Sequence, residues 1–121
     1  MSVPSQAIRT LMEIGVSSAG SGMFRQALAI FDGIEAVRPD SEGPAIGVAL
    51  VHMTTRDHDA AIKVLREEAL PKNPESAETR MLLGVALKLA GRAAECETVI
   101  KELMASSDPK AKSFAQSLQA R

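Results

Sequence analysis

Residues 15–39 read GVSSAGSGMFRQALAIFDGIEAVRP, and this stretch decides the fold. A glycine-rich turn separates two runs in which apolar residues recur at helical spacing. Gly15 and Ala27 are small enough to let two helices approach closely, and large apolar residues such as Phe31 fill the ridges beside them. Pro39 then ends the second run, because proline cannot continue a helix. The stretch therefore predicts an antiparallel helix pair.

The same arrangement occurs three times along the chain. The proline that closes each unit recurs every 35 residues, and the small residues at the helix crossing recur every 34 or 35. The recurring positions are Gly15, Ala49 and Gly84, then Ala27, Ala61 and Cys96, then Pro39, Pro74 and Pro109. Such a period is typical of a solenoid of stacked helix pairs. The spacing predicts helices near residues 4–20, 23–37, 44–55, 58–69, 76–90 and 92–105.

This pattern resembles the tetratricopeptide repeat, in which Leu-Gly in a first helix is followed by Ala-x3-Phe and a closing Pro. The first unit matches well, the second has Ala49 in place of Gly, and the third has Cys96 in place of Ala. We expect an all-α, tetratricopeptide-like solenoid of three helix pairs plus a C-terminal capping helix. The expected single domain covers residues 1–121, with repeats at about 8–41, 42–76 and 77–109 and the capping helix at 110–121. The apolar face predicted to cover the third repeat consists of Ala111, Phe114, Ala115 and Leu118.

The composition fits a helical protein and excludes several classes of function. There is no Trp or Tyr and there are only three Phe, so aliphatic residues and Met must form the core, a mixture suited to close helices. The net charge is −1 and both signs are well mixed, which argues against nucleic-acid binding. No segment approaches the roughly 18 apolar residues of a membrane span, and the N-terminus lacks a secretory signal pattern. We therefore expect a soluble cytoplasmic protein.

No catalytic, cofactor-binding or metal-binding residues are predicted. His52 and His58 lie six residues apart, which does not match the four-residue spacing of a helical zinc site. Cys96 is the only cysteine and stands at a small-residue packing position, and the sequence places no activating base beside it. No glycine-rich phosphate loop or nucleophile motif occurs. These features favour a binding protein over an enzyme.

In tetratricopeptide solenoids, the first helix of each repeat lines the concave surface. Carried onto this chain, that geometry predicts an apolar, methionine-bearing groove that receives a protein partner. The predicted partner-binding residues are Met12, Val16, Ile46, Leu50, Met53, Met81, Val85 and Leu89. The only charges expected near the rim are Arg9, Glu78 and Lys88. The alternative is that the chain's own N-terminus or a second copy covers these residues, since monomers rarely expose large apolar patches.

One function of the repeat family is disfavoured. Tetratricopeptide co-chaperones that hold the carboxylate end of heat-shock proteins use Lys, Arg and Asn in the groove. The corresponding positions here resemble Met12, Val16, Gly47, Glu78 and Leu82. No carboxylate clamp is therefore expected.

The end of the chain resembles a narrower group of proteins. Residues 102–109, ELMASSDP, with Phe114 and Leu118 after them, look like the end of type III secretion chaperones that hold the needle subunit. Residues 34–39, IEAVRP, have parallels in a related group of small secretion proteins from plant pathogens. The resemblance implies a chaperone of the bacterial cytoplasm whose groove covers an amphipathic helix of a secretion substrate or needle subunit, with a second small co-chaperone in many such systems.

Two other functions stay open on the sequence alone. One is a homo-oligomeric scaffold or structural component of a secretion or other multiprotein assembly, in which another copy closes the groove. The other is a secretion component located in the cell envelope, although the absence of a signal pattern counts against it.

Overall fold

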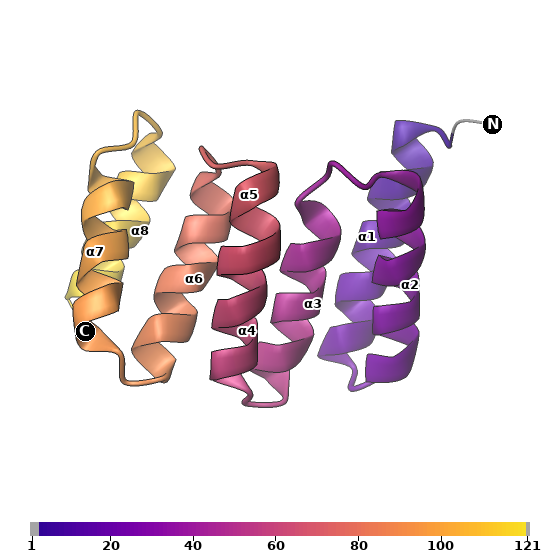
Figure 1. Ribbon diagram of the computed structural model, residues 1–121, viewed down its shortest axis with the longest axis horizontal. Helices are drawn as coiled ribbons and strands as arrows, with labels where there is room; N and C mark the ends of the chain where they lie inside the picture. Colours follow the sequence, from indigo (N-terminus) through magenta and orange to yellow (C-terminus); the bar gives the residue numbers. More distant parts are fainter. Residues whose placement is uncertain (1–2, 121) are drawn as a thin grey trace.

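The computed structural model describes residues 3–120, and every regular element within them is helical. Figure 1 shows the helix pairs side by side in chain order, with α2, α4 and α7 nearer the viewer and α1 and α8 behind. The elements are α1 (Ser5–Gly20), α2 (Phe24–Val37), α3 (Gly43–Thr54), α4 (His58–Val64), η1 (Leu65–Ala69), α5 (Leu70–Lys72), α6 (Ala77–Leu89), α7 (Ala93–Met104) and α8 (Pro109–Gln119). The expected all-α solenoid of helix pairs with a C-terminal cap is confirmed.

Most predicted helix ends agree with the structure within two residues, but the fourth helix is longer than predicted. It continues to Lys72, because its later half opens into the π-helical turn η1. In that turn the amide of Leu70 donates to the carbonyl of Leu65, five residues earlier. The ring of Pro71 would clash with the carbonyl four residues before it in a regular α-helix. The wider turn relieves this clash and lets the helix pass through the proline.

The same type of turn joins the two helices of each pair. The residue in the left-handed conformation is Gly22 in the first turn, Arg56 in the second and Gly91 in the third. The next amide donates to the carbonyl five residues earlier, as from Met23 to Ser18 at 2.8 Å, which is the bond of a Schellman motif. Glycine suits this position because it has no Cβ, so Arg56, with φ at 65°, is a strained member of the set.

Polar side chains fix where three of the helices begin. The carboxylates or hydroxyl that accept backbone amide protons belong to Asp57 for α4, Ser76 for α6 and Asp108 for α8. Because the first amides of a helix have no partner within it, such caps define its start. At the other end of α8, the predicted limit at residue 121 lies outside the described residues. No helix within residues 3–120 is long and apolar enough to cross a membrane.

The core near the N-terminus is built around one aromatic ring. Phe31 is fully buried, and the edge of its ring lies between Gly15 of α1 and Gly47 of α3. A Cβ atom added at either glycine would approach ring atoms closer than 3.0 Å. The missing side chains at these two glycines therefore make room for a ring that three helices share.

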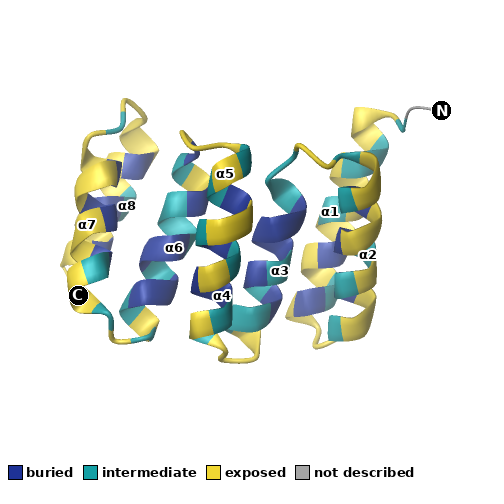
Figure 2. Ribbon diagram, viewed as in Figure 1, coloured by how far each residue is buried: buried dark blue, intermediate teal, exposed yellow. Residues whose placement is uncertain are grey.

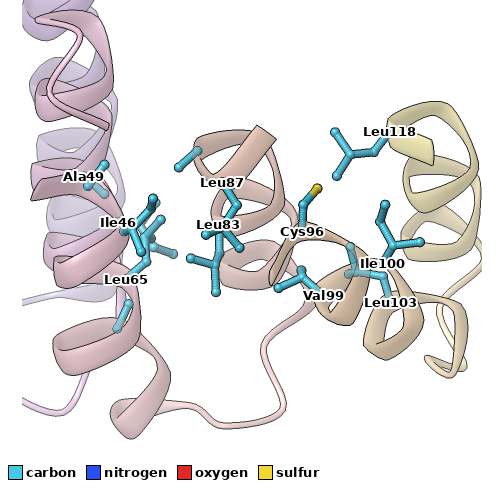
Figure 3. Close-up of a cluster of buried hydrophobic side chains, with 14 of the residues drawn as sticks. Ile46, Ala49, Leu65, Leu83, Leu87, Cys96, Val99, Ile100, Leu103 and Leu118 are labelled. Carbon is cyan, nitrogen blue, oxygen red and sulfur yellow. The ribbon is translucent and has the colours of Figure 1, made fainter. Parts of the chain in front are cut away.

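A larger apolar cluster continues from α3 to α8 (Figure 3). Figure 2 shows buried residues gathered on α3 and α6, while exposed residues dominate the visible sides of α2, α4 and α7. Three residues of α8 close the end of the cluster: Ala111, Ala115 and Leu118. Leu118 fills the space beside Gly84, and Lys88 Nζ donates to the Leu118 carbonyl at 2.6 Å. The cap therefore docks through small residues, and a cation stands at its C-terminus, where it is favourable.

Candidate functional site, an apolar concavity between α3, α6 and α8

A concavity of about 310 Å³ lies where α3, α6 and α8 meet. Its lining residues are Ile46 and Leu50 from α3, Glu78, Met81, Leu82 and Val85 from α6, and Phe114 from α8. Glu78 is the only one of them with a charge. The volume is at the lower end of the roughly 300–1,000 Å³ found for small-molecule pockets, so it suits one or two apolar side chains of a partner. We call this surface the apolar concavity.

Helical periodicity brings its side chains onto one face of each helix. Ile46 and Leu50 are four residues apart on α3, and Met81 and Val85 are four apart on α6. Ile46 is buried, whereas the other three and Phe114 are half-buried. The floor is therefore packed while the walls keep apolar surface in water. Covering that surface is favourable by about 25 cal/mol per Å².

Phe114 reaches the concavity because α8 packs as a further first helix. Helix α8 lies against α6 and α7, and Figure 1 shows this helix behind α7, as α1 lies behind α2. The groove prediction uses the three repeats alone and therefore misses this residue. Alignment on the helix caps is the signal that finds it, since Phe114 stands six residues after Asp108 as Leu82 stands six after Ser76.

The structure brings together four of the eight predicted groove residues in the apolar concavity: Ile46, Leu50, Met81 and Val85. Met12 instead packs beside the cluster around Phe31, and Met53 packs against the larger cluster. Val16 and Leu89 are 42% and 58% exposed and lie outside the concavity. Leu82 and Phe114 complete the lining, although the groove prediction does not include them.

A hydrogen-bond network holds α3 and α6 together beside the concavity. Glu42 directly precedes α3, and its Oε2 accepts from the hydroxyl of Thr79 at 2.6 Å, while its Oε1 accepts from the side-chain Nδ2 of Asn73 at 2.9 Å. Thr79 is fully buried in the first turn of α6. Because Glu42 stands at the start of α3 and Thr79 lies in α6, this charge-assisted bond ties the two helices together next to Glu78 of the concavity.

A larger concavity, of about 600 Å³, lies between the start of α6 and the end of α7 and has both polar and apolar walls. Arg80 and Glu102 pair across it at 3.6 Å, and Arg80 also donates to the Ser76 carbonyl. Arg80 and Glu102 thus neutralise each other, and Glu75 is the third charged side chain of the lining.

The remaining reactive side chain is packed into the fold. Cys96 is buried, and its Sγ donates to the Gly84 carbonyl at 3.5 Å. Burial raises the pKa of the Cys96 thiol, so the thiolate, which is the nucleophilic form, is disfavoured. Residues 3–120 hold no group of three His, Cys, Asp or Glu side chains placed to bind a metal ion.

No protein-family model matches the chain, and no curated protein sequence matches it. The Yersinia enterocolitica type III secretion translocator chaperone SycD has a similar structure, with a TM-score of 0.78 and 16% identity over 97% of this chain and 88% of that one. The fold is tetratricopeptide-like. The first TPR of Spaghetti (RPAP3), bound to the HSP90 peptide SRMEEVD, is also similar, with a TM-score of 0.73 and 14% identity over 99% of this chain and 96% of that one. At these identities the likeness shows the fold alone.

Proposed function

We propose that this chain is a protein-binding chaperone or adaptor of a bacterial type III secretion system. Its apolar concavity would cover an apolar helix of a secreted or needle-type subunit in the cytoplasm and prevent premature assembly. The observation that carries the proposal is the lining itself, in which six of seven side chains are apolar and most remain partly open to water. The SycD-like fold supports the proposal, since that neighbour is a translocator chaperone.

The lining favours a helical partner over an extended one. An extended segment that leaves water needs hydrogen-bond partners for its backbone amides and carbonyls. The six apolar side chains around the concavity offer none. A helix satisfies its backbone internally and presents apolar side chains three and four residues apart, which is the pattern that a groove of this kind can receive.

The charge at the site does not suit an acidic peptide. The HSP90 peptide bound by the Spaghetti TPR reads SRMEEVD and ends with three acidic residues among its last four. The only charge that lines the concavity here is the carboxylate of Glu78, which would repel such an end. This contrast supports an apolar helix over an acidic tail as the partner.

Holding such a helix would keep an assembling subunit monomeric. A subunit whose apolar stripe lies in the concavity cannot use that stripe to join another copy. Each fully buried anchor contributes about 1.5–3 kcal/mol, so a few anchors allow binding that later release can reverse. A second small helical co-chaperone would cover parts of the subunit that this short solenoid leaves exposed.

The test is co-expression with a needle-type subunit from the type III secretion locus of the same organism. We expect the subunit to become soluble and to elute with the chain as a defined complex, measured by size exclusion with light scattering. Leu50→Glu and Met81→Glu should each abolish the complex, because they place a charge in the apolar concavity. Met104→Glu is the matched control, since Met104 is 38% exposed on α7 and lies outside the concavity.

Two outcomes would refute the proposal. If both concavity variants retain helical circular dichroism and still hold the subunit, the concavity is not the binding site. If the chain alone is a stable monomer that binds no apolar dye and rescues no subunit of the locus, the chaperone function itself is wrong.

The second candidate is a self-associating scaffold or structural component of a secretion or other multiprotein assembly. An apolar surface at the N-terminal end of the stack favours it, because Leu11, Ile14 and Met23 are exposed there. The mass of the purified chain distinguishes the two functions. A scaffold would be oligomeric without any partner, and Ile14→Glu would reduce its mass.

A further inference from the structure

Glu78 is the one charged side chain that lines the apolar concavity, and it is exposed in the first turn of α6. A carboxylate near a helix N-terminus is favourable toward the helix dipole, which accounts for its place in α6. The helix dipole does not occupy the carboxylate oxygens, so these can still pair with a cation of a partner. None of the ion pairs or side-chain hydrogen bonds found in residues 3–120 involves the Glu78 carboxylate.

The basic side chains of α6 are committed elsewhere. Arg80 pairs with Glu102 and donates to the Ser76 carbonyl. Lys88 donates to the Leu118 carbonyl at the end of α8. Neither cation of α6 therefore pairs with Glu78, and a negative charge stands beside an apolar surface that is open to a partner.

We infer that the partner helix carries a Lys or Arg one turn away from the apolar side chain that enters the concavity, and that this basic residue pairs with Glu78. The inference rests on the proposed function, since it requires a helix in the concavity. Glu78 precedes Met81 and Leu82 by three and four residues, which is about one helical turn, or 5.4 Å, along α6. If a partner helix lies along α6 with one apolar side chain in the concavity, a residue one turn from that side chain lies level with Glu78.

The pairing would also set the direction of the bound helix. A basic residue at one end of the apolar stripe is attracted by Glu78, whereas an acidic residue at that end is repelled. An exposed ion pair is worth about a 1.4- to 5-fold change in affinity, so the effect is one of selectivity rather than of overall strength.

The test uses three synthetic amphipathic helical peptides with the same Leu stripe. They differ only one turn before the first Leu, where they carry Lys, Gln or Glu. Their affinities for the full chain are measured by fluorescence anisotropy at low and high salt. We expect the order Lys, then Gln, then Glu, with a spread of several fold that shrinks at high salt because screening weakens exposed ion pairs.

Variants of the chain then assign the preference to one carboxylate. Glu78→Gln should remove the preference, and Glu78→Lys should reverse it. Glu67→Lys is the matched control, because it makes the same charge change at an exposed residue of η1 outside the concavity. It should leave the order of the three peptides unchanged.

The outcomes separate this inference from the proposed function. If Leu50→Glu abolishes binding of all three peptides but Glu78→Lys leaves their order unchanged, the concavity binds helices and the inference about Glu78 is overturned. If no peptide binds to the folded chain, both the inference and the proposed function fail. If the chain alone is a dimer that Leu50→Glu converts to monomer, a second copy occupies the concavity and the inference is likewise overturned.

Discussion

Replacing Gly47 with Ala is expected to destabilise the protein, even though Ala is the better helix former. The added methyl group would meet Cε1, Cζ and Cδ1 of Phe31, all closer than 3.0 Å. The ring has no room to move, because it is fully buried and the same edge lies against Gly15 of α1. A shift of the ring away from α3 therefore brings it against α1.

The magnitude follows from two opposing effects. Overpacking a filled core costs about 1–3 kcal/mol, and exchanging Gly for Ala within a helix returns about 0.5–1 kcal/mol. We expect Gly47→Ala to lower the free energy of unfolding by about 1 kcal/mol, which is the difference between the middles of these ranges. Gly33→Ala is the matched control, since Gly33 is an exposed residue of α2 with nothing within 4 Å of its added Cβ. It should raise the stability by about 0.5–1 kcal/mol.

Urea denaturation followed by far-ultraviolet circular dichroism measures both variants against the unsubstituted chain. The two glycine substitutions should shift the midpoint in opposite directions with little change in the m-value. In the double variant, Phe31→Leu should recover part of the stability lost through Gly47→Ala, because residues in contact have non-additive effects on the free energy of unfolding. If Gly47→Ala is as stable as Gly33→Ala, the ring is not confined between α1 and α3 and the packing argument is refuted.

Three further predictions concern the turns, the cap and the thiol. Arg56→Gly should stabilise the protein by about 0.5–1 kcal/mol in urea denaturation, because it relieves a left-handed residue, and a loss of stability would contradict this. Lys88→Met should lower the free energy of unfolding by roughly 1 kcal/mol, because it removes the donor to the Leu118 carbonyl. Hydrogen exchange should become faster in α8 than in the other helices, and a uniform increase would contradict this role of Lys88. Cys96 should react with iodoacetamide more slowly in the folded chain than in urea, because burial raises the pKa of its thiol, and equal rates would show that the thiol is not protected. Since the unfolded chain loses that proton first, stability should fall as the pH rises above the usual thiol pKa.

The periodic features of this protein follow from its sequence because they depend on neighbours along the chain. Helix starts at Ser76 and Asp108 and turns at Gly22 and Gly91 are local hydrogen-bond or backbone requirements. The repeat spacing does not reveal the π-helical turn. Ala61 and Cys96 both stand 13 residues before the proline that closes their unit, although η1 belongs to the second unit alone among the described residues. That turn is therefore known from the structure and not from the spacing.

Which residues line the apolar concavity, by contrast, was decided by tertiary packing. Helical spacing puts Met12, Met53 and Met81 on the inward faces of their helices, but it does not say which of them a neighbouring helix covers. In the structure all three methionines are half-buried against an apolar cluster, but only Met81 of the three lines the concavity. Phe114 joins Met81 only because α8 docks on α6 and α7 as one more first helix. The sequence by itself determined the seven helices and their repeat period, because interactions between residues close along the chain fix both. The shape and lining of the concavity were decided by contacts between helices that are distant along the chain.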